Sequence, residues 1–123
     1  MQYDISIADN IACITIEGNL NSLDLMFMFQ SQEYKDVVNQ YKKILIDYTN
    51  ISGVSITAED AVAITMLGKM GLEKSGKINI AVAVNENERE VMESVTKSIF
   101  SDSQATVFVS DSSKDALQRL AAS

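Results

Sequence analysis

The chain has 123 residues, 46% hydrophobic and 22% charged, so it is long enough to bury one hydrophobic core and lacks the composition of a disordered protein. Its net charge of −7 disfavours binding to nucleic acids and insertion into anionic membranes. It contains no histidine and one cysteine, which excludes a Ser-His or Cys-His catalytic pair, a histidine-ligated metal and an internal disulfide.

The N-terminal region predicts a β-hairpin. Apolar and polar residues alternate over residues 3–7, Asp9-Asn10 interrupts the pattern, and alternation resumes over residues 11–16. We expect Gly18 to end the second strand.

A long helix is predicted next, over residues 22–43. Asn21 or Ser22 is its expected N-cap, and Asp24 would lie in its first turn. Residues 44–48 then form a nearly continuous apolar run, which is typical of a strand covered on both faces.

A loop over residues 52–55 is expected to follow this strand. Thr57 and Asp60 fit a capping box that opens a second helix, which we expect to continue to about Lys74 and to close at Ser75-Gly76.

The C-terminal part alternates between strands and helices. Residues 78–84 and 105–109 predict strands. Residues 85–100 predict an amphipathic helix whose inner face carries Val91, Val95 and Ile99, with Met92 and Phe100 beside them. Residues 112–115 form a capping box for the last helix. The inner stripe predicted for that helix is Ala116, Leu117, Leu120 and Ala121.

These elements follow the order β-β-α-β-α-β-α-β-α, which predicts one α/β domain spanning residues 1–123. Strands joined through helices run parallel, so we expect a mixed, mostly parallel sheet with an N-terminal antiparallel hairpin and helices packed against it. The N-terminal residues lack the features of a secretory signal, and no apolar stretch approaches the ~20 residues of a membrane span. A soluble, cytoplasmic protein is expected.

Catalytic chemistry finds little support among the residues. Cys13 alternates into a strand beside apolar neighbours and is expected to be a small buried residue. Gly68 and Gly71 lack the spacing of a phosphate-binding loop and fit close helix packing instead. Asp47, at a strand end, suits loop hydrogen bonding better than catalysis. We therefore expect no catalytic residue, no metal and no cofactor.

The apolar run at residues 25–29 carries the main functional hypothesis. Five consecutive helical residues advance by ~400°, so one core-facing stripe cannot accommodate them all. Three explanations remain open: a wide core contact beneath the hairpin, a partner or dimer surface, and a pocket for an apolar ligand. Met and Phe side chains are favoured at adaptable interfaces.

Several segments resemble the STAS domain, the fold of bacterial anti-sigma-factor antagonists and of the cytoplasmic regions of sulfate transporters. The segments that carry the likeness are Ile14-Thr15-Ile16-Glu17-Gly18-Asn19-Leu20, Ile44-Leu45-Ile46-Asp47-Tyr48, Ile51-Ser52-Gly53-Val54-Ser55-Ile56 and Lys74-Ser75-Gly76-Lys77-Ile78. The resemblance implies a non-catalytic regulatory module that binds a protein, such as an anti-sigma-type kinase, or forms a homodimer. A related Sec14-like branch implies the alternative, a carrier or sensor of a small apolar ligand.

One departure from the family pattern concerns regulation. Antagonists of this family carry Asp-Ser-Ser-Gly at the start of the second helix, with a phosphorylated serine, whereas this chain has Thr57-Ala58-Glu59-Asp60 there. Ser55 and Thr57 are the nearby hydroxyls and hence the candidate phosphorylation sites. The residues predicted to contact a partner are Met26, Phe27, Phe29, Ser52, Gly53, Ser55, Thr57 and Glu59.

Overall fold

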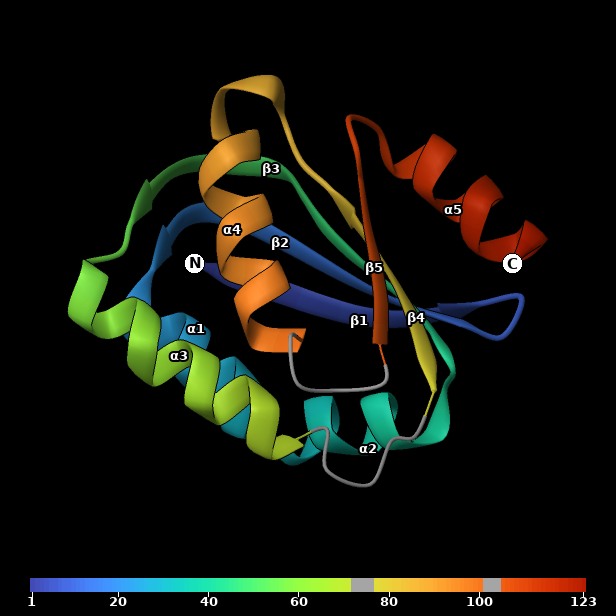
Figure 1. Ribbon diagram of the computed structural model, residues 1–123, viewed down its shortest axis with the longest axis horizontal. Helices are drawn as coiled ribbons and strands as arrows, with labels where there is room; N and C mark the ends of the chain where they lie inside the picture. Colours follow the sequence, from blue (N-terminus) through green and yellow to red (C-terminus); the bar gives the residue numbers. More distant parts are fainter. Residues whose placement is uncertain (72–76, 101–104) are drawn as a thin grey trace.

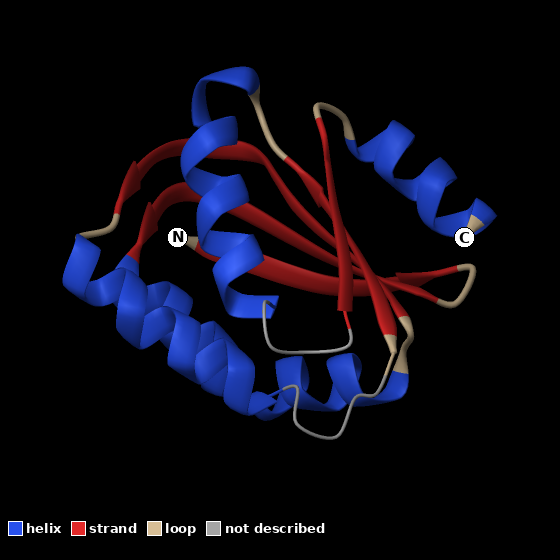
Figure 2. Cartoon of the chain, viewed as in Figure 1, coloured by secondary structure: helices blue, strands red, loops and turns tan. Residues whose placement is uncertain are grey.

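The computed structural model describes residues 1–71, 77–100 and 105–123, and in parts of two helices it describes the backbone alone. Its five strands form one mixed sheet with helices on both faces (Figures 1 and 2). The strands lie side by side in chain order; the first pair is antiparallel and the others are parallel. The predicted α/β architecture and element order are confirmed.

The hairpin consists of β1 (Gln2–Ala8) and β2 (Ile11–Asn21). Asp9 and Asn10 form its turn with φ of 52° and 64°, the left-handed conformation of a two-residue hairpin turn. Asn and Asp tolerate this conformation better than other non-glycine residues, which explains why the turn forms without glycine.

The second strand is longer than predicted. Gly18 does not end it but adopts φ +83° at an irregularity, beside register shifts on either side, and β2 continues to Asn21. The neighbouring β3 (Lys43–Ser55) is extended in the same way. Residues 52–55, predicted as a loop, are strand residues in which Gly53, Val54 and Ser55 pair with Asn19, Leu20 and Asn21.

The predicted helix over residues 22–43 is two helices, α1 (Ser22–Gln30) and α2 (Gln32–Gln40). Ser31 separates them with an extended backbone. Its Oγ donates to the Met28 carbonyl at 2.7 Å and accepts from the Tyr34 N–H at 3.2 Å, so one side chain satisfies both helix ends. Asn21, one of the two predicted caps, accepts from the Asp24 N–H at the start of α1.

The remaining elements follow the predicted order. They are α3 (Ala58–Gly71), β4 (Ile78–Ala83), the 3-10 turn η1 (Glu86–Glu88), α4 (Arg89–Phe100), β5 (Ala105–Ser110) and α5 (Ser113–Ala122). The predicted cap at Ser112 is confirmed, because its Oγ accepts from the Asp115 N–H at 3.1 Å. The end predicted for the second helix, which is α3 in the structure, was placed at Lys74 to Gly76 and lies outside the described residues.

Two predicted inner stripes need correction. On α4, Met92 and Thr96 are buried whereas Val91 is 48% exposed, so the helix is rotated by one position from the predicted face. The side chains of Val95, Ile99 and Phe100 lie outside the described part. On α5, Ala116 and Leu120 are buried as predicted, Leu117 is half-buried, and Ala121 is exposed.

The core has two unequal layers. The larger lies between the sheet and the helices α1 to α4; the smaller lies between the opposite sheet face and α5 alone (Figure 1). Ile44 and Ile46 of β3 face the large layer, while Leu45 between them faces α5. This alternation explains why the strand reads as a continuous apolar run.

Candidate functional site

The starts of α1 and α3 lie side by side at the carboxyl ends of strands β2 and β3. They follow the ends of β2 and β3, which pair through Asn21 and Ser55, and the two helices then pack along each other (Figure 1). The run at residues 25–29 and the segment at residues 52–59, which are far apart in sequence, therefore belong to one region of the molecule.

The apolar run divides between core and surface. Leu25, Met28 and Phe29 are buried, Met26 is half-buried against the core, and Phe27 is 61% exposed. The wide core contact thus accounts for most of the run, and Phe27 is its outward-facing member.

Phe29 is a correction to the predicted contact residues. Its side chain is 1% exposed and meets the ring of Tyr34 edge to face, with 5.0 Å between ring centroids. The break at Ser31 produces this contact, because it turns α2 so that Tyr34 packs over Phe29 in the core. A partner docking on the surface cannot reach this ring.

Phe27 belongs to a larger exposed apolar set on two helices. Leu23 lies one turn before Phe27 on α1, and Val62 and Met66 are similarly spaced on α3. Each of the four side chains is more than 60% exposed. Because α1 and α3 are packed neighbours, these pairs face outward from adjacent helices. We call this set, Leu23, Phe27, Val62 and Met66, the α1–α3 apolar surface.

The polar residues predicted to contact a partner lie at the end of β3 and at the start of α3. Ser52, Ser55, Thr57 and Glu59 are exposed. The Ser55 Oγ accepts from Asn19 Nδ2 at 3.3 Å, whereas the Thr57 Oγ1 caps α3 by accepting from the Asp60 N–H at 3.1 Å. Gly53 has the Asn19 side chain 3.1 Å from where a Cβ would lie. The Ser55 hydroxyl, unlike that of Thr57, does not cap a helix.

The residues considered for chemistry have structural roles. Asp47 is buried and its Oδ1 accepts from the N–H and hydroxyl of Thr49, at 2.9 and 2.7 Å. Burial and, secondarily, the Asp47 carboxylate raise the pKa of the half-buried Cys13 thiol, which keeps it protonated at neutral pH. No cluster of three or more potential metal ligands occurs among the residues that the structure describes.

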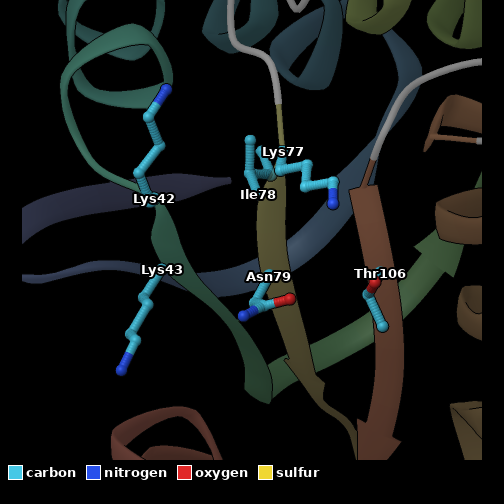
Figure 3. A pocket seen from close by; sticks show the side chains of 6 residues that line it. All are labelled: Lys42, Lys43, Lys77, Ile78, Asn79 and Thr106. Atoms are coloured by element: carbon cyan, nitrogen blue, oxygen red, sulfur yellow. The ribbon is translucent and has the colours of Figure 1, made fainter. Parts of the chain in front are cut away.

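A hollow of about 300 Å³ lies at the amino ends of strands β3, β4 and β5 and is lined by basic side chains (Figure 3). Lys42, Lys43 and Lys77 line it together with Asn79 and Thr106. Figure 3 shows the ammonium groups of the three lysines pointing in different directions, so they do not converge on one anion. A second hollow, of about 120 Å³, is also open, and its lining includes Asp4 and Glu17 of the hairpin.

Comparisons with known proteins define the fold class. No family model matches the chain, and no curated protein matches it. Among solved structures it is similar to an uncharacterised protein of the DUF3478 family with a SpoIIAA-like fold from Shewanella loihica PV-4, with a TM-score of 0.59, 20% identity, and coverage of 97% of this chain and 92% of that one. It is also similar to the anti-sigma factor antagonist SpoIIAA in its unphosphorylated form, with a TM-score of 0.53, 12% identity and 98% coverage of both chains.

The chain therefore has the SpoIIAA-like, or STAS, fold, as its sequence resemblance indicated. At these identities the likeness establishes the fold alone. No helix within the described ranges is both long and apolar enough to cross a membrane.

Proposed function

We propose that this chain is a non-catalytic regulatory module that binds a protein partner through the α1–α3 apolar surface and the adjoining start of α3. The observation that carries the proposal is the exposure of Leu23, Phe27, Val62 and Met66 on two packed helices. Exposed apolar patches rimmed by polar residues are characteristic of interaction sites. Ser55, Thr57 and Glu59 are exposed polar residues at the end of β3 and the start of α3, the helix that carries Val62 and Met66.

The likeness to SpoIIAA suggests which class of partner to test first. The similar protein SpoIIAA is an anti-sigma factor antagonist, so an anti-sigma-type kinase is the first candidate partner to test. Phe27 is the expected hot spot, because large aromatic side chains dominate protein interfaces. A protein partner whose contact face is apolar with basic groups at its rim would also complement the acidic chain.

The test compares Phe27→Glu with Gln118→Glu, which adds the same charge to an exposed position on α5, across the sheet. Binding of a candidate kinase is measured by calorimetry. Because a hot-spot residue contributes about 2 kcal/mol or more, Phe27→Glu should weaken binding at least ~30-fold while Gln118→Glu leaves it unchanged. Equal affinities for both variants, with both folded by circular dichroism, would contradict the proposed surface.

We further propose Ser55 as the regulatory phosphorylation site, ahead of Thr57. Ser55 is exposed, whereas the Thr57 oxygen already caps α3. Intact-mass analysis after incubation with the candidate kinase and ATP should show one added phosphate that Ser55→Ala abolishes and Thr57→Ser retains. Phosphate incorporation into Ser55→Ala would exclude this site.

One observation favours a second candidate, a carrier of a small ligand. The hydroxyl groups of Tyr34 and Thr96 are buried within the larger core layer and have no hydrogen-bond partner. Buried hydroxyls normally have partners, so a polar group of a bound molecule could serve them. Native mass spectrometry of freshly purified protein tests this. An unliganded mass for the wild type would refute the carrier function.

A further inference from the structure

The outer edge of β1 is an open strand edge. β1 is the first strand of the sheet and pairs with β2 alone, and six of its seven residues are exposed. No described element covers this edge. β5, the strand at the other end of the sheet, has a helix on each face, α4 on one and α5 on the other.

The sequence of β1 lacks the features that keep strand edges from pairing. Natural edges are protected by lysine, proline, bulges or short length. β1 has no lysine and no proline, its only charged side chain is Asp4, and its pairing with β2 continues without a register shift. Tyr3 and Ile7 are 37% and 46% exposed on the sheet face that carries the large core layer.

The backbone groups available for pairing can be deduced from the hairpin. In a two-residue hairpin the residues flanking the turn, here Ala8 and Ile11, exchange hydrogen bonds, and bonded and non-bonded pairs alternate along the strands. Tyr3, Ile5 and Ile7 therefore direct their N–H and C=O groups away from β2, toward the open edge. An added strand would meet regularly spaced donors and acceptors.

We propose that β1 pairs antiparallel with β1 of a second copy of this chain, about a two-fold axis at Ile5, so that the two sheets become continuous. This surface is separate from the α1–α3 apolar surface, and the inference does not depend on the proposed function.

The residue pattern of β1 selects this partner and register. With the axis at Ile5, all seven residues of the strand are paired: Ile5 with itself, Tyr3 with Ile7, Asp4 with Ser6, and Gln2 with Ala8. Tyr3 and Ile7 form aromatic–β-branched pairs, which stabilise antiparallel sheets. The pairing is isologous, as a two-fold dimer requires.

Other registers are less favourable. They place like charges opposite each other, pair the strand with the turn, or set apolar side chains beside polar ones. An axis at Asp4 sets two carboxylates directly opposite each other, which is destabilising. An axis at Ser6 places Tyr3 opposite the turn residue Asp9. A shift by one residue places the apolar face of one strand beside the polar face of the other.

The first test is the dissociation constant of the dimer, measured by analytical ultracentrifugation. Ser6→Lys places a lysine opposite Asp4 of the other copy twice per dimer and should tighten binding about three- to tenfold. Ser6→Asp places carboxylates opposite each other and should weaken it at least as much. The double variant Asp4→Ser/Ser6→Asp exchanges the two side chains, keeps the net charge, and should restore wild-type affinity.

The second test fixes the axis by cross-linking in a Cys13→Ser background. Ile5→Cys brings the two cysteines opposite each other, so mild oxidation or a short bis-maleimide should give a covalent dimer. Ile7→Cys is the matched control, because the two copies of residue 7 would lie ~13 Å apart along the strands. A monomeric wild type at high micromolar concentration, equal affinities of the Ser6 variants, or cross-linking at position 7 instead of position 5 would each overturn the proposal.

Discussion

The hydroxyl groups of Tyr34, Tyr48 and Thr96 are the main polar groups inside the larger core layer. Both phenols are fully buried, and desolvation raises the pKa of each well above its ordinary value. For Tyr34 the neighbouring Tyr48 adds to the increase, whereas Thr96 partly offsets it for Tyr48. The Thr96 hydroxyl is thus close to Tyr48, although it makes no hydrogen bond of normal geometry.

Alkaline pH should destabilise the protein through these phenols. Their ordinary pKa is 10.0, and in the folded state it is raised, so the unfolded chain releases protons first as the pH rises above that value. The stabilisation from the protonated phenols is fully present at about pH 9 and below and is lost as the pH rises through 10, with a slope that approaches about 1.4 kcal/mol per pH unit for each buried phenol. Urea unfolding between about pH 9 and pH 11 measures the slope, which Tyr34→Phe should halve.

At neutral pH the same variant loses only an unpartnered hydroxyl and should be at least as stable as wild type. A variant with an unchanged alkaline slope would contradict this assignment.

At the scale of elements, Gly18 and Ser31 account for the two largest differences from the predicted secondary structure. Glycine residues near strand ends and serine residues within helical patterns are both common. Whether each one ends an element depends on the residues that pack or pair with it in space. Pairing with β3 keeps β2 extended past Gly18. The contact between the rings of Tyr34 and Phe29 stabilises the turn between α1 and α2. The first half of each element was predictable from local pattern; its end was not, because strand pairing and core packing decide it.

Gly18→Ala tests the irregularity in β2. The φ of +83° is strained for alanine, which should cost about 1–2 kcal/mol of unfolding free energy. Gly53→Ala is the matched control on the paired strand: its Cβ would meet only the movable Asn19 side chain at 3.1 Å, so the cost should be smaller. Chemical denaturation of both variants measures the difference. Equal costs would mean that the left-handed backbone of Gly18 contributes no strain.

At the scale of the whole molecule, the structure separates two surfaces with different chemistry. The α1–α3 apolar surface lies on the side of the sheet covered by α1 to α4, and the edge of β1 provides backbone pairing. Both lie on a chain with a net charge of −7, so two copies repel each other electrostatically.

Salt should therefore strengthen the proposed dimer. Raising the ionic strength from about 0.01 M to 0.15 M shortens the Debye length from ~30 Å to ~8 Å, which screens the repulsion between the two acidic copies. Sedimentation across this range should show a decreasing dissociation constant. An increasing constant would indicate that attractive ion pairs, rather than strand pairing, hold the copies together.

The element order, the α/β class, the hairpin turn and the caps at Thr57 and Ser112 could be predicted from the amino-acid pattern, because these features depend on contacts within a few residues. The pattern also identified residues 25–29 as too apolar for one core stripe. The packing of the helices, by contrast, buries Phe29 and leaves Phe27 exposed together with Leu23, Val62 and Met66, and no local pattern predicts this division. The same holds for the open edge of β1. Which side of a helix or strand is left uncovered depends on its neighbours in space, and those come from distant parts of the chain.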